Sequence, residues 1–143
     1  MDLTVKTFNE LSNDELYLIL QARARVFVVE QNCPYLDIDD IDRRSYHVFY
    51  HSNAQIDAYL RVYFKEPGIA QIGRVLTIER GKGLGIELLK DGIEVCRNRF
   101  NAKSVYIEAQ SYAIGFYEKA GFKVISDEYL EDGIPHVNMK LDL

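Results

Sequence analysis

The sequence predicts an α/β protein in which helices and strands build one mixed sheet. Strand-like segments of period two and helix-like segments of period 3.6 follow one another in the order β-α-β-β-β-α-β-α-β-β. A glycine-rich turn, Arg80 to Gly85, joins a strand-like run to a helical one, which is typical of a unit whose flanking strands are parallel and joined by a right-handed crossover. With 143 residues and neither repeat nor linker, we expect a single domain over 1–143.

The first third of the chain predicts a short strand and a long helix. Apolar residues alternate from Leu3 to Phe8, and Ser12 precedes Glu15 by three residues, the spacing of a capping box. Apolar residues at helical spacing then continue the helix to about Glu30. They are Leu16, Ile19, Leu20, Val26 and Phe27.

A run of four aspartates follows, at positions 37, 39, 40 and 42. The run lacks the glycine and glutamate that a calcium-binding loop needs at fixed offsets. We interpret it as a solvated loop, with the alternative that its acidic rim faces a cationic substrate.

From Tyr46 onward the period is two, and three strands are predicted near 46–51, 54–65 and 69–78. Turns at Ser52–Asn53 and at 66–68 make them an antiparallel meander. The clean alternation in 54–65 predicts a strand with one buried face. His47 and His51 share a strand face, but at about 3.3 Å per residue they lie roughly 13 Å apart, too far to share a metal ion. No third ligand is evident, so no metal site is expected.

The remaining elements are predicted from patterns around glycines. Gly73 inside the third strand of the meander predicts a bulge or a close approach by backbone or ligand. The helix after the glycine-rich turn has an apolar face that includes Cys96. We then expect a buried strand at 104–109, a helix around 112–119 and a break at Gly121. Two last strands, near 122–126 and 135–141, are separated by the acidic stretch 127–132.

Composition narrows the class of protein. A net charge of −5 argues against a general nucleic-acid binder, and no apolar run is long enough to span a membrane. The start of the chain, MDLTVKTF, has no signal-peptide pattern, so we expect a cytoplasmic protein. Two cysteines form no disulfide framework. Cys96 should be buried, and Cys33 is interpreted as an inert thiol rather than a nucleophile because no histidine lies nearby in sequence.

The turn from Arg80 to Gly85 predicts an anion site. The first N–H groups of the following helix point back at the turn, and Arg80 and Lys82 add positive charge, so a phosphate or pyrophosphate is the favoured ligand. A tight turn without a ligand is the alternative for so short a motif. The turn does not fit a P-loop, and a dinucleotide fingerprint would need glycine where the chain has Ile86 or Leu88.

Two segments in the right order carry a family resemblance. RGKGLG (80–85) resembles the Q/R-x-x-G-x-G/A motif of the GNAT superfamily of N-acetyltransferases, and AIGFYEKAGF (113–122) resembles a second segment of that family. RVFVVEQNCPY (25–35) and LEDGIPHVNM (130–139) resemble the flanking signatures of its ElaA-like branch. The resemblance covers nearly the whole chain and implies the GNAT acyl-CoA N-acyltransferase fold, with one splayed parallel strand pair. Gln110 departs from the asparagine that the wider family usually has there.

This resemblance implies acetyl-CoA, or coenzyme A, as the bound anion. Its diphosphate would bind the amides of residues 82–86, and its pantetheine arm would bind backbone groups of Val75 and Thr77, as an added strand does. A bulge at Gly73 would then splay the parallel strands. The implied cofactor-binding residues are Val75, Leu76, Thr77, Arg80, Gly81, Lys82, Gly83, Leu84, Gly85 and Gln110.

The resemblance also implies direct acetyl transfer in a ternary complex, with Tyr117 as the general acid for the departing thiolate; without the resemblance, Tyr117 would be interpreted as a core aromatic residue. A backbone N–H near Leu76 or Thr77 would stabilise the oxyanion. Glu30, Glu108 and His136 are the candidate bases.

The acceptor would be a primary amine of a small molecule or a protein, and the acidic segments 37–42 and 127–132 favour a cationic one. The protein itself would be a monomer or a homodimer. Two alternatives stay open: a non-catalytic module that binds or senses CoA, and an interaction domain in which the glycine turn is only structural.

Overall fold

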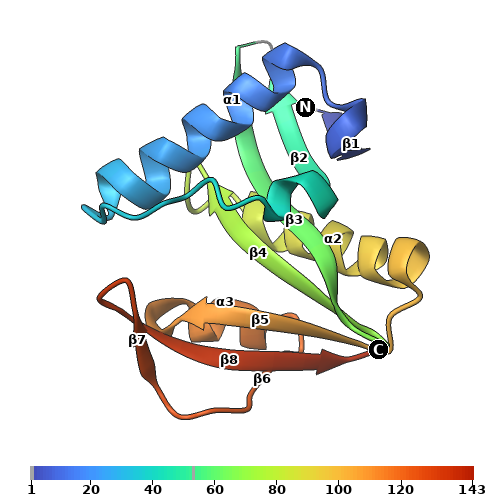
Figure 1. Cartoon of the computed structure of the whole chain (residues 1–143). Coiled ribbons are helices and arrows are strands. Elements are labelled where there is room, and N and C mark those ends of the chain that lie inside the picture. Colours follow the sequence, from blue (N-terminus) through green and yellow to red (C-terminus); the bar gives the residue numbers. More distant parts are fainter. Residues whose placement is uncertain (1, 53) are drawn as a thin grey trace.

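The computed structural model describes residues 2–52 and 54–143, and in them an eight-stranded sheet has helices on both faces (Figure 1). The strand order is β1-β2-β3-β4-β5-β8-β6, and β7 pairs with β8. β4 and β5 are parallel, and the other described pairs are antiparallel. The strands are β1 (Asp2–Thr7), β2 (Tyr46–Ser52), β3 (Gln55–Glu66), β4 (Ile69–Thr77), β5 (Ser104–Gln110), β6 (Lys123–Val124), β7 (Tyr129–Glu131) and β8 (Ile134–Asp142). The predicted mixed sheet is confirmed.

Helices α1 (Asn13–Arg23), α2 (Leu84–Phe100) and α3 (Ile114–Glu118) flank this sheet. Figure 1 shows α1 on one face, and α2 and α3 on the other. The predicted capping box starts α1: the Glu15 N–H donates to Ser12 Oγ at 3.0 Å, and the Ser12 N–H donates to Glu15 Oε1 at 2.8 Å. The helix continues to Glu30, as predicted, but widens into a π-helix over Ala24–Glu30.

Two apolar cores hold the helices to the sheet. The larger lies between the sheet and α2 with α3, and includes Leu60, Ile72, Leu88, Leu89, Ile107 and the buried Cys96. The smaller lies under α1 and includes Ile19, Phe49, Tyr59 and Leu76. Each core covers one face of β3 and β4, so the middle of the sheet is fixed from both sides.

The two-sided burial of β3 contradicts the expected half-buried strand. Tyr59 and Arg61, on the face that alternation marks as solvent-exposed, are 0% and 1% exposed. This face of β3 carries polar residues because aspartate side chains that pair with Arg61 cover it, together with α1. Periodicity detects apolar burial, whereas Arg61 is buried in ion pairs.

The C-terminal elements differ from the prediction in detail. β6 has only two residues, and the acidic stretch 127–132 contains a further strand, β7. The acidic composition of this stretch did not indicate a strand. β7 and β8 form a hairpin, and the turn residues Asp132 and Gly133 both have positive φ. The predicted turn at Ser52–Asn53 includes Asn53, which lies outside the described residues.

Candidate active site

The parallel strands β4 and β5 separate halfway along their length. Their pairing runs from Ile69 opposite Ser104 to Ile72 opposite Ile107, and then stops. At that point Arg74 and Val75 of β4 lie opposite a single residue of β3, which is a β-bulge. The predicted bulge is therefore confirmed next to Gly73. Its left-handed residue, however, is Arg74, with φ +54°, and not the glycine.

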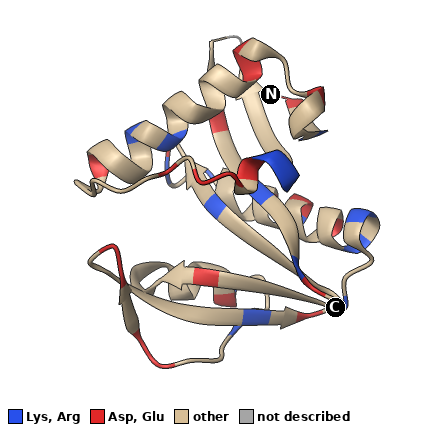
Figure 2. Cartoon of the chain, viewed as in Figure 1, with Lys and Arg blue, Asp and Glu red and all other residues tan. Residues whose placement is uncertain are grey.

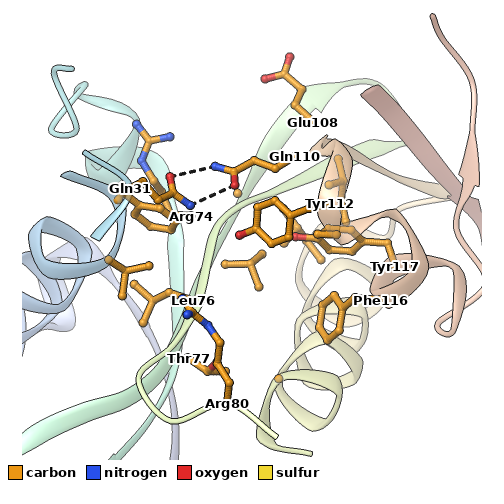
Figure 3. A pocket seen from close by; sticks show the side chains of 18 of the residues that line it. Gln31, Arg74, Leu76, Thr77, Arg80, Glu108, Gln110, Tyr112, Phe116 and Tyr117 are labelled. Atoms are coloured by element: carbon orange, nitrogen blue, oxygen red, sulfur yellow. Dashed lines mark hydrogen bonds between the residues drawn. The ribbon is translucent and has the colours of Figure 1, made fainter. Parts of the chain in front are cut away.

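A cavity of about 670 Å³ fills the wedge between the separated strands (Figure 3). Its wall comes from the π-helical segment and the loop after it, from β4, the glycine turn, the end of β5, α3 and the β7–β8 hairpin. It contains every residue implied to bind the cofactor: Val75, Leu76, Thr77, Arg80, Gly81, Lys82, Gly83, Leu84, Gly85 and Gln110. Residues as far apart in the sequence as Val26 and His136 thus share one cavity.

The glycine turn forms one end of this cavity and leads into the 17-residue helix α2. Gly81 and Gly83 have φ of +83° and +74°, and a Cβ on either would meet no atom within 4 Å. They are glycines because of their backbone conformation, and the space over them is open. Gly85 differs, because a Cβ there would lie 3.3 Å from the Phe116 ring. An exposed turn before a helix N-terminus fits a diphosphate.

The two cations of the turn are engaged with carboxylates. An Arg80 guanidinium nitrogen lies 3.4 Å from Glu30 Oε1, and Lys82 pairs with Glu79. All four side chains are exposed. An anionic ligand would compete with these surface pairs, which contribute little free energy.

Tyr117 extends from α3 toward the middle of the cavity (Figure 3). Its ring packs edge-on against Phe116 and Phe122, with centroids 5.1 and 6.0 Å away, and the residue is 7% exposed. Burial raises the pKa of its hydroxyl, which has no hydrogen-bond partner in the described residues. The phenol is thus protonated and free to donate at neutral pH.

The three candidate bases lie in different places. Glu30 is not part of the cavity wall and pairs with Arg80 outside it. Glu108 lies on β5 at the end of the cavity away from Arg80 (Figure 3). His136 lines the cavity from β8 and is 8% exposed.

The His136 ring is held in one orientation. Nδ1 lies 2.7 Å from the Ile134 carbonyl oxygen, which can only accept a hydrogen bond, so Nδ1 carries a proton. The Tyr129 ring stacks on it, and Nε2 lies 3.7 Å from Glu131 Oε2. In the neutral ring Nε2 therefore keeps its lone pair and can accept a proton.

Arginines on α1, β3 and β4 neutralise the aspartate segment, so the expectation of a solvated loop was wrong. Figure 2 shows this acidic segment crossing basic positions on β3 and β4. Asp42 receives hydrogen bonds from Arg23 at 2.6 Å and Arg61 at 2.9 Å. The other contacts join Arg23 to Asp37, Arg61 to Asp39, and Arg74 to Asp37 and Asp39. This network, three cations and three carboxylates, holds the loop beside the cavity and leaves it no free acidic rim.

Sequence reasoning missed a contact that crosses the cavity. The Gln31 and Gln110 amides bond to each other twice, at 3.0 and 3.1 Å (Figure 3). Gln31 lies in the segment 25–35 that carried the resemblance, but nothing in its pattern indicated a partner 79 residues away. Tyr112 and Arg74 also line the cavity without having been predicted to do so.

Other classes of site find no support. The described residues hold no group of three metal-ligating side chains, and no helix in 2–52 or 54–143 is long and apolar enough to cross a membrane. Both cysteines are buried and unbonded to each other. Cys33 lies at the cavity wall, where its Sγ donates to the Asp132 carbonyl oxygen at 3.5 Å.

Comparison with known proteins agrees with this geometry. The family model described as an acetyltransferase (GNAT) domain matches residues 7–143. The protein ElaA of Escherichia coli is 40% identical over 137 residues, with 92% of this chain and 90% of that protein covered. Its crystal structure superimposes with a TM-score of 0.93 at 38% identity, over 99% of this chain and all of the other. An acyl-CoA N-acyltransferase structure from Pseudomonas aeruginosa gives 0.90 at 35% identity, covering 99% of both chains.

Proposed function

Because the chain belongs to the GNAT family of acetyltransferases, we propose that it moves an acetyl group from acetyl-CoA directly to a primary amine. One observation carries the proposal: the glycine turn, the splayed strands and the Tyr117 hydroxyl share a single cavity. The same cavity extends beyond Tyr117 to His136 and Glu108, so both reactants can reach its centre from different ends.

The turn and the strand edge would hold acetyl-CoA, which supplies an activated acyl group as a thioester. The backbone amides after Gly81 bind the diphosphate at the start of α2. Beyond Ile72, β4 lacks a β5 partner, so its backbone groups on that side are free to bind the amide-bearing arm. A backbone N–H near Leu76 or Thr77 stabilises negative charge on the thioester oxygen.

Two side chains of this chain move the protons. His136 Nε2 takes a proton from the amine as its nitrogen bonds to the acyl carbon, and Tyr117 gives its proton to sulfur as the carbon–sulfur bond breaks. The products are an amide and CoA thiol, and proton exchange with solvent restores both side chains. We assign the base to His136 rather than Glu30 or Glu108 because its ring is buried and oriented at the cavity wall.

Two measurements test the proposal, first coenzyme A binding and then turnover. Gly83→Asp would place a side chain and a negative charge where the diphosphate must bind, and we expect CoA affinity to fall at least tenfold. Gly133→Asp is the matched control, because Gly133 has φ +76° and open space around its Cβ position but lies in the β7–β8 turn. Equal CoA affinity in both variants would locate the site elsewhere.

Release of CoA thiol from acetyl-CoA in the presence of an amine panel then distinguishes an enzyme from a sensing module. We expect release that depends on the amine and an acetylated product. Tight CoA binding without turnover on any amine would favour the non-catalytic alternative.

A further inference from the structure

A second, smaller hollow of about 390 Å³ adjoins the main cavity at its Glu108 end. We call it the outer hollow, and the side chains that matter in its wall are Asp39, Tyr63, Arg74, Glu108, Glu131 and Asp132. Most of these also line the main cavity, so the two spaces are continuous. Figure 3 shows Glu108 on the far side of the Gln31–Gln110 pair from Arg80. A molecule in the outer hollow is thus separated from the cationic glycine turn.

The charges of the outer hollow do not cancel. On the β4 side, Arg74 is neutralised by Asp37 at 2.8 Å and Asp39 at 3.3 Å. On the β5 and β7–β8 side are three carboxylates, those of Glu108, Glu131 and Asp132. Among the described residues Glu108 and Asp132 pair with no Lys or Arg, and Glu131 approaches only the imidazole of His136. These three carboxylates therefore form no salt bridge with a described Lys or Arg, although Arg61 and Arg74 line the same hollow.

A largely buried tyrosine lies at the same place. Tyr63 is 7% exposed and lines both spaces, and its hydroxyl has no hydrogen-bond partner among the described residues. It lies beside Gly73, where a Cβ would be 3.8 Å from the Tyr63 oxygen. The hydroxyl is therefore available to a ligand in the two spaces. An amine can donate to this oxygen and remain next to Glu108.

We infer that the acceptor is an aliphatic diamine or polyamine, whose second amino group stays protonated and binds in the outer hollow against Glu108 and Asp132. This rests on the proposed acetyl transfer. The attacking nitrogen must be neutral, so the carboxylates cannot serve it in the reactive state. A second ammonium, separated by a short carbon chain, can use them while the first amine reaches His136.

The pKa of Glu131 reflects the crowding of carboxylates in the outer hollow. Burial raises the pKa of this carboxyl, and the charges of Glu108 and Asp132 raise it further, while His136 and Arg74 act in the opposite direction. A cation bound among these carboxylates would lower the pKa of Glu131 and favour its ionised form.

A charge series of acceptors tests the inference: 1,4-diaminobutane, butylamine and 4-aminobutanoate carry an ammonium, a methyl group or a carboxylate at the far end. We expect kcat/KM to be highest for the diamine and lowest for the amino acid. In the Glu108→Gln/Asp132→Asn double variant, kcat/KM for the diamine should fall roughly 10- to 100-fold, the range for losing charge-assisted hydrogen bonds. Butylamine should be acetylated as before. Glu66→Gln removes an exposed carboxylate outside both spaces and serves as the control.

The outcomes separate this inference from the proposed function. Equal loss for diamine and butylamine would make Glu108 or Asp132 part of the general machinery and overturn the inference while acetyl transfer stands. Equal kcat/KM for all three acceptors would also overturn it. Calorimetry of 1,4-diaminobutane with the CoA-bound protein gives a readout without turnover. Binding that the double variant loses supports the inference, and absence of binding in the parent contradicts it.

Discussion

Gln31 and Gln110 form a reciprocal amide pair, in which each side chain donates to and accepts from the other, at 3.0 and 3.1 Å. The pair connects the segment after the π-helix with the end of β5, and therefore crosses the cavity. Figure 3 shows it between Glu108 and the aromatic side chains of Tyr112 and Tyr117. It lies between the outer hollow and the reaction centre that we propose.

A double-mutant cycle measures this contact. We expect Gln31→Ala and Gln110→Ala each to lower the free energy of unfolding by about 1 kcal/mol, since two partly buried neutral hydrogen bonds are lost. The double variant should lose little more than either single one, which gives a coupling of about 1 kcal/mol. Urea unfolding of the four proteins gives these values. Strictly additive losses would show that the two amides do not stabilise each other.

The parts of the site formed by one short segment were predictable from the sequence. The contacts between residues far apart in the sequence were not. The turn from Arg80 to Gly85 could be interpreted because its glycines, its cations and the helix after it occupy one short segment. Arg23, Arg61 and Asp42 pair across the fold, and no local pattern in the sequence indicates these partners. The acidic segment therefore looked solvated although Asp42 is 5% exposed.

The bulge in β4 was likewise only partly predictable from the sequence. Sequence indicated Gly73 because a glycine inside a strand often marks a bulge or a close approach by backbone or ligand. In the structure the left-handed residue of the bulge is Arg74, whose guanidinium contacts Asp37 and Asp39. These ion pairs offset the cost of the unusual backbone angle, and they involve residues more than 30 positions away.

Asp42 anchors the ion network, and its loss should be costly. Asp42→Asn removes the charge that pairs with Arg23 at 2.6 Å and Arg61 at 2.9 Å, and leaves two buried guanidinium groups short of a partner. We expect the free energy of unfolding to fall by about 3 kcal/mol, as when one member of a buried pair is removed. Asp40→Asn is the control, because Asp40 is exposed and, within residues 2–52 and 54–143, its carboxylate pairs only with Arg43, at 3.5 Å. Its effect should stay within about 0.5 kcal/mol.

The lowered pKa of Asp42 predicts that the fold loses stability in acid. Burial alone would raise the pKa of Asp42, but its hydrogen bond with Arg23 and the charges of Arg23 and Arg61 outweigh burial and lower it. A lowered pKa in the folded state gives stability that is fully present above the unfolded value of about 4 and is lost as pH falls below it. Unfolding followed from pH 7 to pH 2 should show a steeper loss in the parent than in Asp42→Asn. Parallel curves would mean that Asp42 titrates alike in both states.

The cysteines should be chemically silent. Burial raises the pKa of Cys96 to about 12, so its thiol stays protonated and unreactive in the folded protein. We expect a thiol reagent to leave Cys96 unmodified until urea is added. Cys33→Ser should keep kcat within a few-fold, because direct transfer needs no acyl-enzyme. An acetylated cysteine trapped with acetyl-CoA would instead indicate a covalent route.

Tyr117→Phe tests the proposed general acid. The substitution keeps the ring that packs between Phe116 and Phe122, so stability and CoA affinity should change little. Loss of the proton donor should lower kcat about 10²- to 10⁴-fold, with a smaller change in the KM for acetyl-CoA. Tyr50→Phe is the control, because it removes a hydroxyl bonded to Asp91 outside the cavity.

The pH dependence of kcat adds a second readout for the same residue. Because burial raises the pKa of Tyr117, its phenol should hold its proton throughout the range from pH 6 to pH 9, and the parent should show no loss of rate there from its ionisation. His136→Gln should lower kcat as well, because it removes the proposed base. If Tyr117→Phe retains kcat within a few-fold where chemistry limits the rate, the thiolate departs unaided. Tyr117 is then a packing residue of α3.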